Sequence, residues 1–169
     1  PRPMRAYAID DYLSWMEESS TAIQQADPFH LISAGCEGTM GVENIEVYKR
    51  IHELPGINYA TLHLWPKNWG WFTDTLIYSE LSSIVSKSKQ YIDEHASICS
   101  KLSKPMVVEE FGLPRDLHSF NVNSGVVARN IYLFELFRYF RETPINRNTI
   151  AGFNIWAFGG YGRPVAGQV

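Results

Sequence analysis

An α/β fold built on parallel strands is predicted by three features of this sequence. Short apolar segments, typical of buried strands, alternate four times with longer segments of helical periodicity. Connections long enough to hold a helix require the strands that they join to be parallel. A complete eight-stranded barrel needs about 250 residues, whereas the chain has 169. We therefore expect the second half of a (β/α)8 TIM barrel, about strands 5 to 8 with their helices.

This interpretation makes residues 1–169 a single partial domain, with the first half of the barrel missing from the chain. The sequence opens on Pro1 without an initiator methionine and stops just after a glycine-rich segment, so we expect a fragment of a longer polypeptide. A doubly wound open sheet is the alternative. No glycine-rich phosphate loop follows a strand here, which argues against that nucleotide-binding fold.

The composition excludes several classes of partner. Hydrophobic residues make up 45% of the chain and aromatic residues 14%, which is ample for a packed core. A net charge of -3, with both signs interspersed, predicts no nucleic-acid partner. No apolar run approaches the roughly 20 residues of a membrane-spanning helix, so no membrane insertion is expected. Cys36 and Cys99 form no disulfide framework and match no zinc spacing.

Four segments carry apolar residues at helical spacing, and they are residues 12–23, 45–51, 81–102 and 126–140. The third gives the clearest signal, because its apolar residues recur three, four or seven apart with polar residues between them. Asp10 or Asp11 can cap the first helix, and Ser124 can cap the last. Prolines follow the first, second and fourth helices and mark their ends.

Four short apolar segments are predicted strands, and they are residues 30–34, 59–65, 106–110 and 150–156. Each is followed by polar or aromatic side chains that a core does not need: Glu37, then His63 and Trp65, then Glu110, then Trp156. Because parallel barrel strands deliver their carboxyl ends to one mouth, these side chains are expected to converge on one pocket.

Glu109 and Glu110 end the third predicted strand. Adjacent strand residues point to opposite sides, so one carboxylate is expected in a cleft and the other toward the surrounding layer. Barrels of this class keep their chemistry at this end of the strands. The simpler interpretation is that both acids form salt bridges with an arginine such as Arg115, and this stretch alone leaves both interpretations open.

Four of the five tryptophans lie at or beyond predicted strand ends, and they are Trp65, Trp69, Trp71 and Trp156. Indole rings in loops offer flat apolar platforms that match the C–H faces of sugars, while polar side chains bind the hydroxyls. Core packing is the simpler interpretation for each tryptophan alone, and a buried structural histidine is the simpler one for His63. Their shared position favours a sugar-binding site.

Four motifs follow one another along the chain: Gly-Cys-Glu-Gly at 35–38, His-Leu-Trp-Pro at 63–66 with Trp-Gly-Trp at 69–71, Val-Val-Glu-Glu-Phe-Gly at 107–112 and Asn-Ile-Trp-Ala at 154–157. Together they resemble glycoside hydrolase family 5, and within it the endo-β-1,4-mannanases. The resemblance implies that Glu110 is the nucleophile, that His63 is the histidine after strand 6, and that Trp156 supports the attacked sugar. Many members have tyrosine where Trp65 stands, and tryptophan lacks that hydroxyl.

The resemblance also implies that one catalytic group lies outside the chain. Family members end strand 4 with Asn-Glu-Pro, in which the glutamate is the acid/base, and this chain begins Pro1-Arg2-Pro3, as though cut after that glutamate. Retaining hydrolysis needs two carboxyl groups about 5 to 5.5 Å apart. We therefore expect Glu110 to attack and a glutamate before Pro1 to protonate the leaving group, with Arg2 reaching the leaving-group sugars.

The activity implied for the intact protein is hydrolysis of internal β-1,4 bonds in β-mannan with retention, in a secreted or cell-envelope location and without a metal or organic cofactor. Trp65, Trp69, Trp71 and Glu37 would line neighbouring subsites. A cellulase or other β-glucanase of the same barrel family would use the same residues. The remaining interpretation is that this chain alone is an inactive piece that at most binds sugar. Besides β-mannan, a companion N-terminal half-barrel segment is the expected partner.

Overall fold

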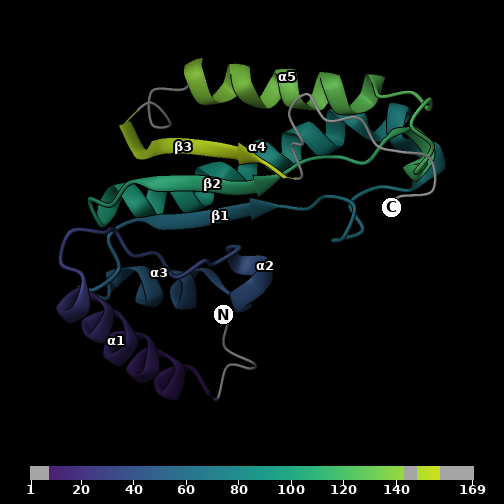
Figure 1. The fold of residues 1–169 in the computed structure, drawn as a ribbon. Helices are drawn as coiled ribbons and strands as arrows, with labels where there is room; N and C mark the ends of the chain where they lie inside the picture. Colours follow the sequence, from purple (N-terminus) through teal and green to yellow (C-terminus); the bar gives the residue numbers. More distant parts are fainter. Residues whose placement is uncertain (1–7, 143–147, 157–169) are drawn as a thin grey trace.

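The computed structural model, which describes residues 8–142 and 148–156, contains a parallel sheet of three strands in chain order (Figure 1). These strands are β1 (Ala60–Leu64), β2 (Met106–Phe111) and β3 (Ile150–Ile155). Helix α4 (Ile77–Lys101) connects β1 to β2, and α5 (Val127–Glu142) lies between β2 and β3 in the chain. Each connection thus contains a helix, as parallel pairing requires.

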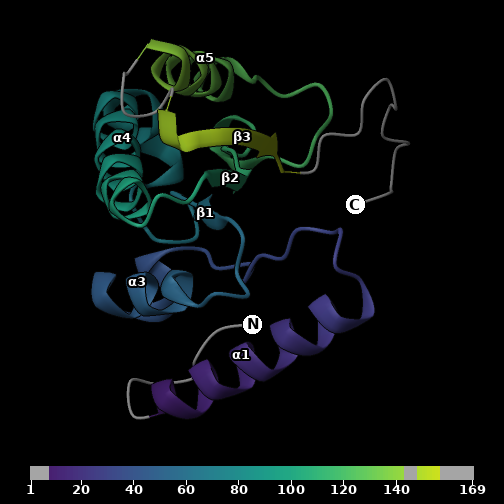
Figure 2. The same cartoon turned by 90° about the vertical axis from the view of Figure 1, so that its left-hand side faces the viewer.

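The other helices are α1 (Ile9–Ala26), α2 (Thr39–Val42) and α3 (Ile45–Glu53), all before β1, with the short 3-10 helices η2 (Asp74–Leu76) and η3 (Asp116–His118) in the loops after β1 and β2. Figure 2 shows α3, α4 and α5 arranged in an arc around the sheet. Within the described residues, no helix combines the length and the apolar character needed to cross a membrane.

The four predicted helices form, with small differences at their ends. Asp10 and Asp11 lie in the first turn of α1, where a carboxylate favours the positive end of the helix dipole, and Ala8 is the N-cap. Asn44 caps α3 by accepting a 2.9 Å hydrogen bond from the Val47 amide. The prediction that Ser124 caps α5 is wrong, because its hydroxyl donates to the Asn121 carbonyl.

The strand predicted at residues 30–34 is also wrong, because residues 31–38 form an irregular segment beside β1. Ile32 accepts from the Asn58 amide at 2.8 Å, and Glu37 accepts from the His63 amide at 3.2 Å. A regular parallel ladder repeats every two residues, and these two bonds are an odd number of residues apart on both segments. Between them the Thr61 hydroxyl donates to the Cys36 carbonyl at 2.9 Å.

The core lies between the sheet and the arc of helices. The side chains that β1 and β2 bury completely include Leu62, Leu64, Met106, Val108 and Phe111. The Phe111 ring meets the rings of Phe137 and Phe140 from α5 at 6.0 and 5.9 Å, both near perpendicular. This packing fixes β2 against α5, and the end of β2 is therefore held rigidly where its acidic residues begin.

Two histidines are fully buried among these helices, His52 on α3 and His95 on α4. The Tyr48 ring lies between them, with ring centroids 4.2 Å from His52 and 4.6 Å from His95. Each Nδ1 donates at 2.7 Å to the carbonyl oxygen four residues earlier, on Tyr48 and Tyr91. Burial lowers the pKa of each imidazole to about 4, so both are neutral at pH 7.

These buried imidazoles should make the protein less stable in acid. An unfolded histidine titrates near pH 6.5, so the unfolded chain binds more protons between pH 6.5 and 4, and the free energy of unfolding falls as pH drops through that window. We expect His52→Gln to reduce the loss of stability between pH 7.0 and 4.5 by about 2 kcal/mol. Urea unfolding followed by tryptophan fluorescence at both pH values measures this.

The matched control is His30→Gln, because the His30 side chain is 82% exposed. Since His30 and its partner Asp27 are both on the surface, this variant should change the pH dependence less than His52→Gln does. An equal loss of stability in the unmodified protein and in His52→Gln would contradict the assignment of that loss to the buried imidazole.

Candidate active site

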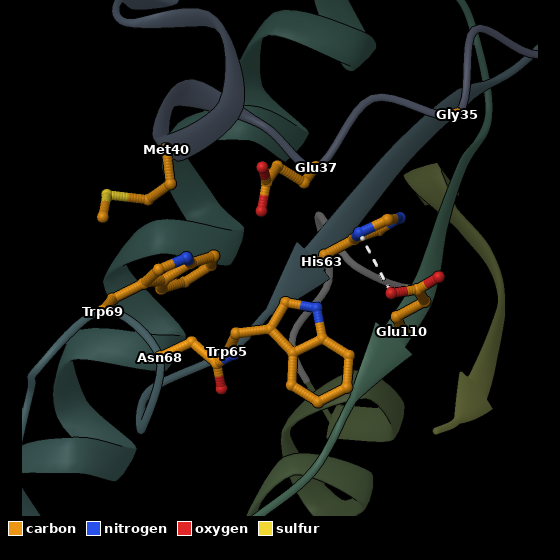
Figure 3. A pocket seen from close by; sticks show the side chains of 8 residues that line it. All are labelled: Gly35, Glu37, Met40, His63, Trp65, Asn68, Trp69 and Glu110. Carbon is orange, nitrogen blue, oxygen red and sulfur yellow. Dashed lines mark ion pairs between the residues drawn. The ribbon is translucent and has the colours of Figure 1, made fainter. Parts of the chain in front are cut away.

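A pocket of about 590 Å³ opens at the carboxyl ends of β1 and β2 (Figure 3). Its lining comes from three parts of the chain, and the residues are Gly35, Glu37, Met40, His63, Trp65, Asn68, Trp69 and Glu110. The strands contribute His63 and Glu110, the loop after β1 contributes the indoles, and the segment around Glu37 forms the opposite wall. Groups predicted at three different strand ends therefore share one pocket.

His63 lies between two carboxylates. Its Nδ1 is 3.3 Å from Glu110 Oε2, and its Nε2 is 3.2 Å from Glu109 Oε2. The three side chains are only 14%, 28% and 32% exposed for His63, Glu110 and Glu109. Arg115 takes no part in this cluster, because its Nη1 donates to the Ser124 carbonyl. Among the described residues, the His63 imidazole and not an arginine pairs with both acids.

A β-bulge explains how neighbouring acids reach one imidazole. Leu62 pairs with Val108 and His63 pairs with Glu110, which leaves Glu109 as an extra residue in β2. An extra residue locally breaks the two-residue alternation of a strand. Glu110 lines the pocket as one member of the pair was expected to. Glu109 also contacts the imidazole, which the alternation did not predict.

Trp65 stands between the Glu110 pocket and a second pocket of about 510 Å³, because its side chain lines both. In the second pocket it meets Trp156 edge to face, with centroids 5.5 Å apart and ring planes at 81°. The Trp156 amide donates to the Phe111 carbonyl at 3.1 Å, which holds the residue beside the end of β2. Its ring is 56% exposed and available to a ligand.

The other two predicted aromatic residues, Trp69 and Trp71, line different pockets. Trp69 lines the Glu110 pocket and packs against Tyr91, with centroids 5.3 Å apart. Trp71 lies outside that pocket, although it touches Trp69, and it borders a smaller cavity of about 210 Å³ on α4. Arg2 lies outside the described residues.

Sequence reasoning missed three residues of the pocket, which are Gly35, Met40 and Asn68. Met40 belongs to α2, a helix of only four residues with too little sequence to show a period. Asn68 lies in the loop after β1 between two tryptophans, and its position was the only available signal. Gly35 has a φ of 61°, a left-handed conformation that turns the segment toward the pocket.

Chemically, the arrangement offers an oriented carboxylate beside aromatic surfaces. Across residues 8–142 and 148–156, no group of three or more His, Cys, Asp and Glu side chains could hold a metal ion. Cys36 and Cys99 are free and buried. Burial raises the pKa of each thiol to about 11, so neither is a ready nucleophile. The ionisable side chains that line this pocket are therefore the carboxyl groups of Glu37 and Glu110 and the imidazole of His63.

The sequence matches a family model described as GH family 5 beta-mannosidase-like over residues 1–169. A rice protein, mannan endo-1,4-beta-mannosidase 7, is 29% identical over 119 residues, which cover 62% of this chain and 30% of that protein. Mannan endo-1,4-beta-mannosidase 2 of Arabidopsis thaliana is 23% identical over 173 residues, covering 94% and 38%. The chain therefore spans about a third of the length of these curated relatives.

Solved structures give the same result for the fold. A family 5 mannosidase from Rhizomucor miehei superimposes with a TM-score of 0.79 at 28% identity, covering 89% of this chain and 37% of the other. An endo-1,4-beta-D-mannanase from Thermotoga petrophila shares the fold, with a TM-score of 0.60 at 18% identity over 86% and 40% of the two chains. The predicted half-barrel fold class is confirmed, although only three of its expected strands are regular. The chain belongs to glycoside hydrolase family 5, within its β-mannosidase-like group.

Proposed function

We propose that the intact protein is a retaining glycoside hydrolase that cleaves internal β-1,4-mannosidic bonds in mannan. The observation that carries this proposal is Glu110, a carboxylate that lines a tryptophan-walled pocket at the carboxyl end of a parallel strand and contacts His63. The names of the relatives from rice and Arabidopsis support mannan as the substrate.

In this proposal Glu110 is the nucleophile. Its carboxylate attacks the anomeric carbon, the glycosidic C–O bond breaks, and the enzyme carries the sugar as an ester until water releases it. The 3.3 Å ion pair with His63 Nδ1 supports this role, because the imidazole beside one oxygen restricts the movement of the carboxylate. Glu109 on the opposite imidazole nitrogen holds the ring itself in place.

The leaving oxygen needs a proton from a second carboxyl group about 5 to 5.5 Å from the nucleophile. We propose that this acid/base is a glutamate directly before Pro1 in the intact protein, with Arg2 beside the leaving-group sugar. The resemblance described above supports both roles. The chain covers only 30% and 38% of the relatives from rice and Arabidopsis, which leaves room for that glutamate in the rest of an intact protein.

The sugar chain is proposed to lie along the tryptophans. Trp156 would support the attacked sugar, because its half-exposed ring stands next to Trp65 and beside the end of β2. Trp65, Trp69 and Glu37 would contact neighbouring sugars, since all three line the Glu110 pocket. For Trp71 the proposal is weaker, because it borders a different cavity, and a contact would require a longer substrate.

The missing barrel half is proposed as the partner of this chain, either within one polypeptide or as a companion N-terminal segment. Among the described residues β3 pairs only with β2, so its outer edge offers unpaired backbone groups. The Phe153 side chain on β3 is 44% exposed. We also infer a secreted or cell-envelope location, because an enzyme that cuts a large polysaccharide must meet it outside the cell.

Chain-end cleavage is the second candidate. The matching family model is described as β-mannosidase-like, and the Rhizomucor miehei protein with the TM-score of 0.79 is named a mannosidase. An enzyme that removes terminal mannose would use the same carboxylates and would differ only in how the pocket is closed. A third candidate is a cellulase or other β-glucanase, which would cleave a β-glucan instead of mannan.

Glu110→Gln in the intact protein should lower the hydrolysis of mannan by at least about 10³-fold, because an amide cannot attack the anomeric carbon. Release of reducing sugar measures the loss. The matched variant is Glu109→Gln, which changes the adjacent acid outside the pocket and should cost clearly less. Unaltered turnover in Glu110→Gln would refute the nucleophile.

Incubation of the intact protein with mannan should lower the viscosity quickly and release oligosaccharides of mixed length, because internal bonds are cut. Carboxymethyl cellulose should remain uncut. Mannose as the sole early product would favour chain-end cleavage, and breakdown of the cellulose would favour the rival substrate. Chromatography of early products separates these outcomes.

Residues 1–169 expressed alone should not hydrolyse mannan, because the proposed nucleophile then lacks a group that protonates the leaving oxygen. Addition of a separately expressed N-terminal half should restore activity if the two halves associate. Hydrolysis by the purified 169-residue chain alone would contradict the proposed source of the acid/base.

A further inference from the structure

Two residues of α4 reach the loop that forms one wall of the Glu110 pocket. Tyr91 and His95 are four residues apart and therefore lie on one face of the helix. Both are buried, and their rings pack together with centroids 4.3 Å apart. The loop that they meet, residues 37–40, carries Glu37 and Met40 into the pocket.

The contacts are hydrogen bonds to consecutive backbone groups of this loop. His95 Nε2 accepts from the Thr39 amide at 3.0 Å. The Tyr91 hydroxyl accepts from the Met40 amide at 3.1 Å and donates to the Glu37 carbonyl at 3.2 Å. Thr39 and Met40 are the first residues of α2, whose opening amides have no acceptor within the helix. The two side chains thus act as a cap supplied by another helix.

Gly38 allows this close approach. Its φ is 97°, a conformation that favours glycine, and it is the N-cap residue of α2 without a side chain to cap it. A Cβ at this position would collide with the Tyr91 hydroxyl and with His95 Nε2. The loop and the helix are therefore fitted to each other at a residue that leaves no room for a side chain.

His95 is in the protonation state that the contact requires. Its Nδ1 donates to the Tyr91 carbonyl at 2.7 Å, which leaves the lone pair of Nε2 directed at the Thr39 amide. Because burial lowers the pKa of this imidazole to about 4, the ring is neutral and accepts at neutral pH.

Tyr91 also touches the facing wall of the pocket. Its ring packs against Trp69, with centroids 5.3 Å apart, and Trp69 lines the pocket together with Glu37 (Figure 3). One buried tyrosine therefore contacts the backbone of one wall and the indole of the other. A shift of its hydroxyl would change the distance between the two walls.

We propose that Tyr91 and His95 are positioning residues that hold the loop of residues 37–40 so that Glu37 is set for binding sugar hydroxyls in the Glu110 pocket. This rests on the proposed function for the role of the pocket, but the hold on the loop is independent of it. Neither residue lines the Glu110 pocket, so both act on a ligand through the placement of Glu37. Their loss should weaken substrate binding more than it slows the reaction.

The test compares KM and kcat on mannan for variants of the intact protein. Tyr91→Phe keeps the ring packing and removes both hydroxyl bonds, and His95→Leu removes the acceptor for Thr39. His95→Leu should raise KM roughly tenfold, since one lost hydrogen bond is worth about that factor, and Tyr91→Phe, which loses two, should raise KM at least as much. In both variants kcat should change less than about threefold. His95→Gln retains an acceptor and should restore most of the KM.

Tyr132→Phe is the matched control, because it also removes a buried tyrosine hydroxyl bond, the 3.0 Å contact with Ser88, far from the loop in sequence. It should leave KM unchanged. In a Glu37→Ala background the effect of Tyr91→Phe on KM should disappear, because the hydroxyl acts through Glu37. A full additional tenfold effect in that background would overturn the proposal.

A second measurement does not depend on hydrolysis. By NMR, the amides of Thr39 and Met40 should exchange at least about tenfold faster in Tyr91→Phe and His95→Leu, while amides of β1 stay protected. Unchanged exchange of the Thr39 and Met40 amides would overturn the proposal that Tyr91 and His95 hold this loop. Faster exchange in a protein that cleaves no mannan would support this hold and reject the proposed function instead.

Discussion

The pairing of β1 with β2 is the constraint on which the rest of the site depends. Parallel strands end at the same edge, and the register places His63 opposite Glu110. The bulge at Glu109 then brings a second carboxylate to the same imidazole. Without that extra residue His63 would stand opposite Glu109, and the pocket would lose the contact that orients its carboxylate. The geometry of this cluster is set by strand register, which buried core residues such as Leu62 and Val108 help to maintain.

The other wall of the pocket is held in a different way. Residues 31–38 form an irregular segment where a strand is predicted. Side-chain hydrogen bonds to its backbone replace much of the backbone ladder that a strand would form. Thr61 binds Cys36, and the pair on α4 binds residues 37–40. A ladder would fix the direction of every second residue, whereas these contacts tolerate the left-handed turns at Gly35 and Gly38. The irregular wall can therefore turn Glu37 toward Glu110 within a short distance along the chain.

Much of the fold can be predicted from the sequence, because the spacing of the apolar residues indicates which side chains are buried. The strands β1, β2 and β3 and helix α4 were predicted within a few residues of their ends, and parallel topology then predicted a shared mouth for Glu110 and His63. The burial of a segment does not show whether its backbone forms the hydrogen bonds of a strand. Ile32 and Ala34 are as buried as strand residues, so residues 30–34 were mistaken for a strand. The bulge, and the turn at Gly70 after which Trp71 lies outside the pocket that Trp69 lines, depend on backbone geometry that the apolar pattern does not predict.

Within the part of the site that this chain carries, selection between mannan and cellulose would come from the polar side chains of the pocket and not from its tryptophans. Mannose and glucose differ only in the configuration at C2, and an indole platform contacts C–H faces that both sugars present. A stacking surface therefore cannot separate a mannanase from a cellulase, whereas a site built to hydrogen-bond a particular hydroxyl rejects its analogue strongly. Besides Glu110 and the indole N–H groups, the polar side chains that line the Glu110 pocket are Glu37, Asn68 and His63. Glu37 and Asn68 line the same pocket as His63, which contacts two carboxylates, and are proposed to contact that hydroxyl. Because Tyr91 and His95 hold the Glu37 loop, substrate selection in this fold would depend on two residues buried inside a helix layer.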